Sequence, residues 1–413
     1  MNSDNCWLRE DCRLCASKNL ELVLELPSTP PANEFLEEPR EQEIYPLKIN
    51  LCSNCGHAQL SHVVNPKLLF DDYLYVSGTS SVFKKHFESY ANKLKERFLF
   101  NSTDLVCEIG SNDGTLLRNF QNFKILGIEP AKAIAARANN EGVVTLNSYF
   151  DFELSKKIKE EYGGAQVIIA NNVMAHIDDL DEVLKSIKLL LTDGGVFVME
   201  VQYLGDLING GLFDMIYFEH LDYHALTPLV SFFEKHKLRL FDVEKVDTHG
   251  GSIRCFVCHQ DDLEKKNTVA LKELLLHEKA KNLNSRKSWD QLENLINKSK
   301  SDLLKVINDM KSEGKKIIAY GAPAKLTTLF YTFGLTKQNV DYVVDDSPFK
   351  TGRYTPGEHI PIYDSKVIYQ DQNKPDVVII SAWNFSESII KMHSSLQGVT
   401  WITPLPKLKI TKT

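Results

Sequence analysis

The segment from Asp214 to His224 holds the densest group of proton-transfer side chains in this 413-residue chain. Tyr217, Glu219 and His220 are close neighbours within it. A histidine with an ordinary pKa near 6.5 can accept a proton at neutral pH, and an adjacent carboxylate raises its basicity. A tyrosine can donate a hydrogen bond to an oxyanion that develops during a reaction. The segment therefore predicts a general base with its helpers, although a polar surface loop could have the same composition.

A polar loop between two short apolar runs forms a second candidate site. The run 105–107 predicts a buried strand, and the loop Gly110-Ser-Asn-Asp-Gly114 comes soon after it. A helix is expected next, and a second strand over 125–128 ends on Glu129. Nucleotide-binding βαβ units place an acid at about this distance, where it holds ribose hydroxyls. The spacing predicts a ligand with a ribose; an ordinary αβ turn that binds nothing is the alternative.

The charge of this loop indicates which ribose ligand fits. A dinucleotide brings a pyrophosphate, which needs a glycine fingerprint and bare helix N–H groups. The loop lacks the pattern G-x-G-x-x-G, and acids at Glu108 and Asp113 would repel a pyrophosphate. S-adenosylmethionine instead carries a positive sulfonium and ammonium and no phosphate. The residues expected to bind it are Gly110, Asn112, Asp113, Glu129, Pro130 and Asn171.

Four of the eight cysteines form two C-x-x-C knuckles. The knuckles are Cys12-Arg-Leu-Cys15 and Cys52-Ser-Asn-Cys55, and a segment rich in proline and glutamate separates them. This is the layout of a four-cysteine structural zinc site. Closed tetrahedral thiolate coordination leaves no open position, so the metal is assigned to folding rather than to catalysis. The alternative is that the four thiols bind no metal.

Composition and charge limit the class of protein. The length predicts two or three domains, and eight cysteines in a chain of this size are not a disulfide framework. A net charge of −7 argues against non-specific binding to nucleic acid or to a bilayer. No apolar run is long enough to span a membrane, and Met1 to Glu10 is polar and charged, so we expect a cytoplasmic protein. We expect a monomer or a weak dimer that acts on a small substrate, with neither nucleic acid nor membrane as a partner.

The middle of the chain alternates between apolar strands and helices, as an open α/β sheet requires. The expected elements are helices over 82–98 and 180–191 and strands over 143–149, 166–170 and 196–201. In such sheets ligands bind at the carboxyl ends of the strands. Asn171 and His176 fall just after one of these strands, so we expect them at the crevice. Arg254 follows two glycines before a further strand, which makes it a candidate for binding phosphate groups of the substrate.

A second α/β pattern begins after a charged stretch, 261–313, which predicts one or two long helices that join domains. Strands are expected over 316–320, 340–344 and 377–381. After the first of these strands, a loop opens a helix and ends on Lys325. Backbone N–H groups and a lysine at this point could bind a phosphate, and a structural turn is the alternative.

The ordered set of motifs resembles one known family. The motifs are the two cysteine knuckles, the loop Gly-Ser-Asn-Asp-Gly, Ile-Tyr-Phe-Glu-His, His-Gly-Gly-Ser-Ile-Arg, Tyr-Gly-Ala-Pro-Ala-Lys and Arg353-Tyr-Thr-Pro-Gly with Ile360-Pro-Ile. Together they resemble the three-domain sugar C-methyltransferases, which methylate nucleotide-activated keto-deoxysugars. The resemblance covers essentially the whole chain. Phe218 stands where this family usually has a histidine.

The resemblance implies an α/β fold with three parts. These are a zinc-binding domain over 1–70, a class I methyltransferase domain with a Rossmann-like sheet over 71–260, and a helical linker with a second Rossmann-like domain over 261–413. The implied cofactors are S-adenosylmethionine and a structural Zn²⁺. The implied substrate is a nucleotide-linked sugar such as a dTDP-4-keto-deoxyhexose, methylated at the carbon beside the ketone, most often C3.

The reaction explains the residue types of the first segment. A carbon nucleophile forms by loss of a proton beside a ketone, which requires a base and a donor to the enolate oxygen. We expect His220 to remove the proton and Glu219 to orient or polarise it. Tyr217, with Tyr75 or His176, is expected to stabilise the enolate. The alternatives are an O- or N-methyltransferase, which needs no carbon-acid base, and a non-catalytic zinc scaffold, which needs no cofactor loop either.

Overall fold

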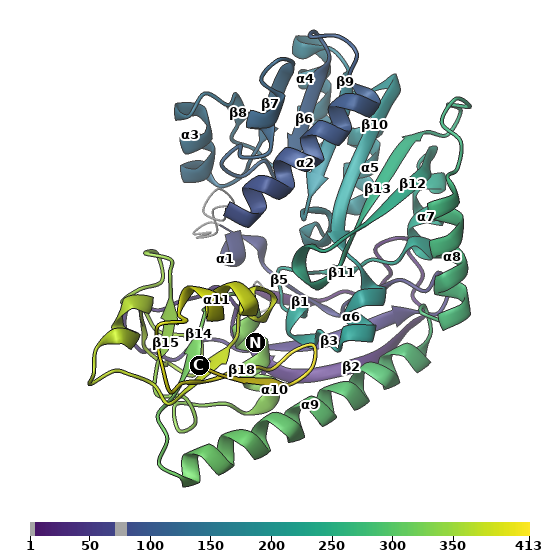
Figure 1. The fold of residues 1–413 in the computed structure, drawn as a ribbon. Coiled ribbons are helices and arrows are strands. Elements are labelled where there is room, and N and C mark those ends of the chain that lie inside the picture. The colour runs from purple at the N-terminus through teal and green to yellow at the C-terminus, as the bar shows by residue number, and fades with distance from the viewer. Residues whose placement is uncertain (1–4, 71–80) are drawn as a thin grey trace.

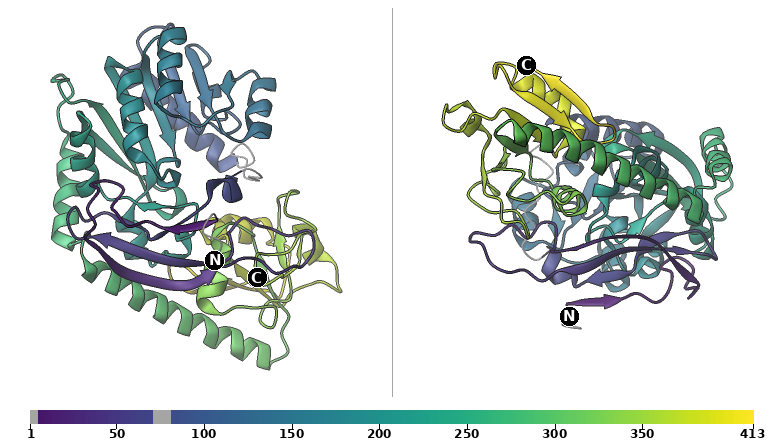
Figure 2. Two further views of the ribbon diagram at one scale, coloured as in Figure 1. Left: turned by 180° about the vertical axis from the view of Figure 1, so that it is seen from behind. Right: turned by 90° about the horizontal axis from the view of Figure 1, so that it is seen from below.

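The structure is a computed structural model that describes residues 5–70 and 81–413. A four-stranded, a seven-stranded and a six-stranded sheet mark an N-terminal, a central and a C-terminal domain (Figure 1). The central domain stands above the other two in this view, and the N-terminal and C-terminal domains lie beneath it (Figures 1 and 2). Tyr75, one of the expected catalytic residues, lies outside the described residues.

The N-terminal sheet includes a strand from the central part of the chain. The elements of this domain are β1 (Cys6–Leu8), β2 (Leu20–Thr29), β3 (Tyr45–Cys52), β4 (Ala58–Leu60), β5 (His62–Val64) and α1 (Pro66–Phe70). Strands β2, β3 and β4 pair antiparallel in this order, and β11 (Asp222–Tyr223) completes the sheet on β4. The N-terminal domain therefore holds the end of the segment that carries Glu219 and His220.

The central sheet has the strand order β12-β13-β10-β9-β6-β7-β8, in which β13 alone runs opposite to the other six strands. Its strands are β6 (Leu105–Ile109), β7 (Lys124–Ile128), β8 (Thr145–Leu146), β9 (Ala165–Asn171), β10 (Leu191–Gln202), β12 (Leu238–Val246) and β13 (Ser252–His259). Its helices are α2 (Ser81–Phe98), α3 (Lys132–Asn140), α4 (Phe152–Tyr162), α5 (Leu180–Leu190), α6 (Leu204–Gly210) and α7 (Leu226–Lys235). The chain order reverses between β6 and β9, which is where ligands bind in open α/β sheets.

Two expected elements of the central domain differ from the structure. The helix expected after the loop 110–114 is only a short 3₁₀ turn, η2 (Leu117–Phe120), whose apolar side chains are buried under the sheet. The strand expected over 143–149 is only β8. Val143, the first residue of the expected strand, instead closes helix α3 through a hydrogen bond from its N–H to the carbonyl of Ala138. The apolar residue that suggested the start of a strand thus lies at the end of a helix.

The C-terminal domain is a second parallel sheet with one antiparallel edge strand. Two helices lead into it, α8 (Val269–Lys281) and α9 (Arg286–Ser312). The remaining elements are β14 (Ile317–Tyr320), α10 (Lys325–Phe333), β15 (Val343–Asp345), β16 (Ile362–Asp364), β17 (Val377–Ile380), α11 (Ser386–Met392), β18 (Thr400–Thr403) and β19 (Lys409–Lys412). The strand order is β16-β15-β14-β17-β18-β19, with β19 antiparallel to β18.

One continuous apolar core joins the three domains. It includes side chains from β3, from one face of the central sheet and from α10, among them Ile49, Ile168 and Phe330. Helix α9 crosses the base of the molecule, where it contacts β2, α6 and α10 (Figure 1). Burying this shared surface fixes the domains relative to one another. In the part of the chain that the structure describes, no helix is both long enough and apolar enough to cross a membrane.

Candidate active site

The four knuckle cysteines lie together and fit a zinc ion. Their Sγ atoms are all within 4.8 Å of one another, with 3.6 Å between Cys12 and Cys55 and 3.5 Å between Cys15 and Cys52. Tetrahedral zinc with Zn–S distances of about 2.3 Å requires sulfurs about 3.8 Å apart. Each knuckle turns back through a residue with positive φ, Ala16 at 58° and Gly56 at 76°. The sulfur set therefore matches the predicted closed structural site.

The loop after β6 has a tight backbone conformation that a side chain at Gly110 would disrupt. Gly110 has a φ of 64°, and a Cβ there would be 2.5 Å from Cγ2 of Val173. Asn112 also has a positive φ, 49°, which asparagine tolerates better than most residues. The loop is held against the second strand by a hydrogen bond from the Ser111 N–H to the carbonyl of Ile128. This tight turn leaves backbone atoms open to close approach by a ligand.

Glu129 connects the loop to the end of β7. Its Oε2 accepts the N–H of Asn112 at 2.9 Å, and its Oε1 accepts the N–H of Ala131 at 2.8 Å. A carboxylate has about four lone-pair positions, so two remain for the hydroxyls of a ribose. Pro130 follows, and its carbonyl accepts a hydrogen bond from Asn147 at 2.8 Å. Glu129 thus keeps acceptor positions at the end of β7, as the prediction of a ribose ligand requires.

Three acids, Glu108, Asp113 and Glu129, are buried together at this site. Burial, followed by repulsion from Asp113 and Glu129, raises the pKa of Glu108 well above its usual value. Burial also raises the pKa of Glu129. Asp113 accepts hydrogen bonds from the N–H and hydroxyl of Thr115. A cationic ligand would relieve this repulsion, as the sulfonium and ammonium of S-adenosylmethionine would.

The end of β9 faces the same edge. Asn171 is the last residue of β9, and its Oδ1 is buried with no hydrogen-bond partner among the described residues. Asn172 follows with a φ of 55°, and Val173 packs on Gly110. The chain then enters η3 (Met174–His176). The structure thus brings all six expected cofactor residues to the carboxyl edges of β6, β7 and β9.

The hydrogen bonds of His220 define its tautomer. Its Nδ1 lies 2.9 Å from the carbonyl oxygen of Met215, and its Nε2 lies 3.0 Å from the hydroxyl of Tyr217. A carbonyl oxygen can only accept, so Nδ1 must carry the proton. In neutral His220 the lone pair is therefore on Nε2, and Tyr217 donates to it. This is the arrangement of a base whose reactive nitrogen is already oriented.

Glu219 is not oriented toward His220 as expected. Its Oε1 accepts a hydrogen bond from the Asn33 amide at 2.8 Å, and its Oε2 is buried with no hydrogen-bond partner among the described residues. Burial raises the pKa of Glu219 to about 7, so the neutral acid is well populated at physiological pH. The Met215 carbonyl, rather than Glu219, fixes the ring of His220. The neighbouring Phe218 is fully buried and packs on Tyr45.

The ring of His176 packs edge-on against the segment 214–224, which holds the candidate base His220 and is called the base segment below. The ring centroid of His176 is 5.1 Å from that of His220, at an interplanar angle of 81°. The backbone supports this contact, because the Leu221 N–H donates to the carbonyl of Ala175 at 2.7 Å. The loop after β9 therefore brings the cofactor edge and the base segment together.

Arg254 does not face a ligand site. Its guanidinium donates to Glu200 at 2.7 and 3.0 Å and to Glu244 at 3.2 Å, and it lies 3.5 Å from the ring centroid of Tyr90. Only 3% of Arg254 is exposed. The guanidinium is occupied by partners within the central domain, so we do not retain Arg254 as a phosphate ligand.

Lys325 lies where the C-terminal domain meets the base segment. Its Nζ donates to Asn384 at 2.7 Å and lies 3.7 Å from the ring centroid of Trp383. Trp383 in turn donates its Nε1–H to Asp214 at 2.6 Å. Burial lowers the pKa of Lys325 to about 8, and the nearby Asp214 opposes that effect. Next to this lysine, the Thr328 hydroxyl donates to the carbonyl of Ile216 at 2.7 Å.

Two residues of the site were not expected from the sequence. Asn33 lies between the knuckles, and Trp383 meets Asp214, the first residue of the segment 214–224, from about 170 positions away. Their spacing carries no local signal. The sequence signal near Asn33 is limited to the high proline content of the surrounding segment.

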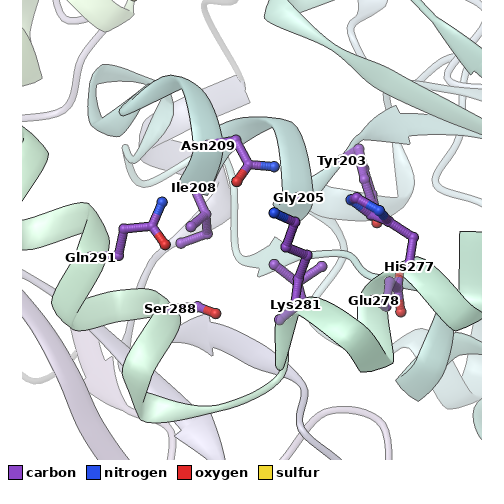
Figure 3. A pocket seen from close by; sticks show the side chains of 10 residues that line it. Tyr203, Gly205, Ile208, Asn209, His277, Glu278, Lys281, Ser288 and Gln291 are labelled. Atoms are coloured by element: carbon purple, nitrogen blue, oxygen red, sulfur yellow. The ribbon is translucent and has the colours of Figure 1, made fainter.

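A small cavity between α6, α8 and α9 is separate from this site (Figure 3). Its volume is about 20 Å³, enough for one water molecule. Tyr203, Glu278 and Lys281 are among its lining residues (Figure 3). Its size excludes a cofactor or a sugar.

Comparisons with known proteins find matches to family models and to a relative that covers nearly the whole chain. Three family models match: a zinc binding domain over 12–70, a methyltransferase domain over 83–241 and a C-methyltransferase C-terminal domain over 247–406. The C-methyltransferase NovU of Streptomyces niveus is 30% identical over 409 residues, which are 97% of this chain and 96% of that protein.

Solved structures resemble less than half of the chain. Magnesium protoporphyrin IX methyltransferase (ChlM) from Synechocystis PCC 6803, with bound SAM, is 11% identical over 43% of this chain and 79% of its own, with a TM-score of 0.32. The PH0226 protein from Pyrococcus horikoshii OT3 is 14% identical over 45% of this chain and 94% of its own, with a TM-score of 0.35.

Proposed function

Because this chain belongs to the family of S-adenosylmethionine-dependent C-methyltransferases, we propose that it methylates a ring carbon of a nucleotide-linked keto-deoxysugar. The substrate class we propose is a dTDP-4-keto-deoxyhexose, methylated at C3. The observation that carries the proposal is the tautomer of His220, whose Nε2 lone pair is held ready by the Met215 carbonyl. An O- or N-methyltransferase does not have to remove a proton from carbon.

In this proposal one exchange of hydrogen bonds gives Tyr217 and His220 their roles. The Tyr217 hydroxyl leaves Nε2 of His220 and donates to the ketone oxygen of the sugar. The freed Nε2 removes the proton from the adjacent carbon, and the electrons of that C–H bond form the enolate. Tyr217 and His176 stabilise the enolate oxygen. When bound, S-adenosylmethionine supplies an electrophilic methyl group for this carbon.

Six residues would hold the cofactor: Gly110, Asn112, Asp113, Glu129, Pro130 and Asn171. The loop N–H groups approach it closely, Glu129 binds its ribose hydroxyls, and the buried acids balance its positive charge. Lys325 would bind the substrate's diphosphate, since its present partner, the Asn384 amide, is neutral and can be displaced by an anion. The nucleotide then lies toward the C-terminal domain.

The experiment that tests the proposal is mass spectrometry of a panel of nucleotide-linked 4-keto sugars incubated with the protein and methyl-deuterated S-adenosylmethionine. We expect one sugar to gain an intact labelled methyl group on a ring carbon. Label on an oxygen or a nitrogen, or cofactor binding without transfer to any sugar of the panel, would contradict it.

A further inference from the structure

The N-terminal domain contacts the base segment just before His220. Asn33 lies in the connection between β2 and β3, and its Nδ2–H donates to Glu219 Oε1 at 2.8 Å. Only 1% of Glu219 is exposed. Asn33 is the one side chain that donates a hydrogen bond to this carboxyl group among the described residues. The orientation of Glu219 thus depends on a residue from another domain.

The same domain contacts the segment just after His220. His57 Nε2 lies 2.6 Å from Asp222 Oδ1, and both side chains are fully buried. Arg13 Nε lies 4.0 Å from Asp222 Oδ2. Arg13 is within the first cysteine knuckle and His57 is two positions beyond the second. The two knuckles therefore converge on Asp222.

The backbone between these contacts is fixed as well. The Leu60 N–H donates to the carbonyl of Leu221 at 2.8 Å, and Gln59 is the register partner of Asp222 where β11 joins β4. On its other side, the Leu221 N–H donates to the carbonyl of Ala175. Residues 219, 221 and 222 are thus all tied to the N-terminal domain, and His220 lies among them.

We propose that the N-terminal domain is a working part of the active site, in which Asn33 and Asp222 are positioning residues for His220. The zinc knuckles act through His57, which hydrogen-bonds Asp222, and through the charge of Arg13, whose Nε lies 4.0 Å from it. This inference rests on the proposed role of His220 as the base. It gives the zinc-binding domain a catalytic consequence beyond its own folding.

The first test compares Asn33→Ala with the native holoenzyme. Asn33 is half-buried on a loop, so its truncation leaves the core intact. A misplacement of about 1 Å at a reacting group can cost about 100-fold in rate, and we expect a loss of kcat of that order. We expect KM for the sugar, affinity for S-adenosylmethionine by calorimetry and zinc content to stay unchanged. Solvent deuterium exchange at the reacting carbon should fall in parallel with kcat.

The matched control is Gln42→Ala. Gln42 lies on the same connection and accepts a hydrogen bond from Gly357 N–H at 2.7 Å, so it joins the N-terminal domain to the C-terminal domain without touching the base segment. We expect this variant to keep native kcat. A second variant, Asp222→Asn, keeps the shape of the side chain but removes the charge that faces Arg13, and should lower kcat with zinc still bound.

Each outcome decides the inference. Asn33→Ala with full zinc content and native kcat would overturn it, whatever Asp222→Asn does. Equal losses in Asn33→Ala and Gln42→Ala would also overturn it, because they would indicate a general effect of loosening the domain. The proposed function fails separately, through survival of proton exchange when His220 itself is replaced.

Discussion

Glu129 and Asp345 close the first loops of the two Rossmann-like units in the same way. Glu129 directly follows the second strand of its unit and Asp345 is the last residue of its own. Each accepts an N–H from the loop after the first strand, from Asn112 to Glu129 and from Ala322 to Asp345 at 2.6 Å. Each also accepts the N–H two positions ahead, from Ala131 and Ser347. The two domains thus share a loop frame, but among the described residues only the first loop is surrounded by several buried acids.

Replacing Glu129 with alanine should weaken binding of S-adenosylmethionine. The variant loses the ribose contact and also frees the loop at Asn112. A hydrogen bond to a charged group contributes about 1.5–3 kcal/mol, which predicts an affinity about 10- to 100-fold weaker. Calorimetry measures this directly. Glu160→Ala, an exposed position on α4, serves as the control, and equal affinities in the two variants would remove Glu129 from the cofactor site.

Replacing His220 with asparagine should abolish both turnover and solvent deuterium exchange at the reacting carbon. Asparagine can still donate to the Met215 carbonyl but has no basic nitrogen. Cofactor binding should be preserved, because His220 belongs to a different segment from the loop 110–114. Exchange measured by NMR in deuterated buffer would reveal a different base if it persisted.

Replacing Tyr217 with phenylalanine should slow proton removal without abolishing it. The change removes the hydroxyl that donates to His220 Nε2 in the free enzyme, and in our proposal to the enolate. Loss of one oxyanion donor typically costs about 3 kcal/mol of barrier, which corresponds to a rate about 100-fold lower. Single-turnover methyl transfer measures it. A native rate would assign enolate stabilisation to other groups.

Lys325→Gln tests the phosphate contact. We expect KM for the nucleotide sugar to rise about 10-fold, the lower limit for loss of one charge-assisted hydrogen bond, with kcat nearly native. Lys391→Gln, an exposed lysine on α11, is the control. A lower thermal midpoint with native KM would instead make Lys325 a structural partner of Asp214.

The sequence predicted the parts whose signals are local. Cysteine spacing located the four-cysteine cluster, and the run that ends on Glu129 located the loop that we propose for the cofactor, because a strand, a tight turn and an acid are contiguous in the chain. Strand β13 places Cys255 and Cys258 on opposite faces, where they belong to different apolar cores.

Contacts between residues far apart in the chain could not be predicted from the sequence. Arg254 was a candidate for phosphate because it follows two glycines, but β13 brings it beside Glu200 on β10, and a buried arginine with that partner has no charge to offer a ligand. The pairing of Asn33 with Glu219 joins positions 186 apart, and nothing in either neighbourhood encodes it. Side-chain partners across domains follow from packing, which residue spacing does not describe.

The last prediction concerns Glu219 and pH. Burial raises its pKa from 4.5 to about 7, so the folded protein holds this proton more tightly than the unfolded chain does. Stability from the neutral carboxyl is complete below about pH 4.5 and is lost as the pH rises through about 7. The difference of about 2.5 units corresponds to about 3 kcal/mol at higher pH. Glu219→Gln stays neutral and can still accept from Asn33, so it avoids this loss.

Thermal unfolding of the native protein and of Glu219→Gln at about pH 5 and about pH 8 measures the effect, because all other titrating groups are common to both. We expect the midpoint temperature of Glu219→Gln, relative to that of the native protein, to be higher at about pH 8 than at about pH 5. Identical shifts in the two proteins would mean that Glu219 ionises normally in the fold. Asn33 would then face a carboxylate at neutral pH, and its hydrogen bond would be charge-assisted rather than one to a neutral acid.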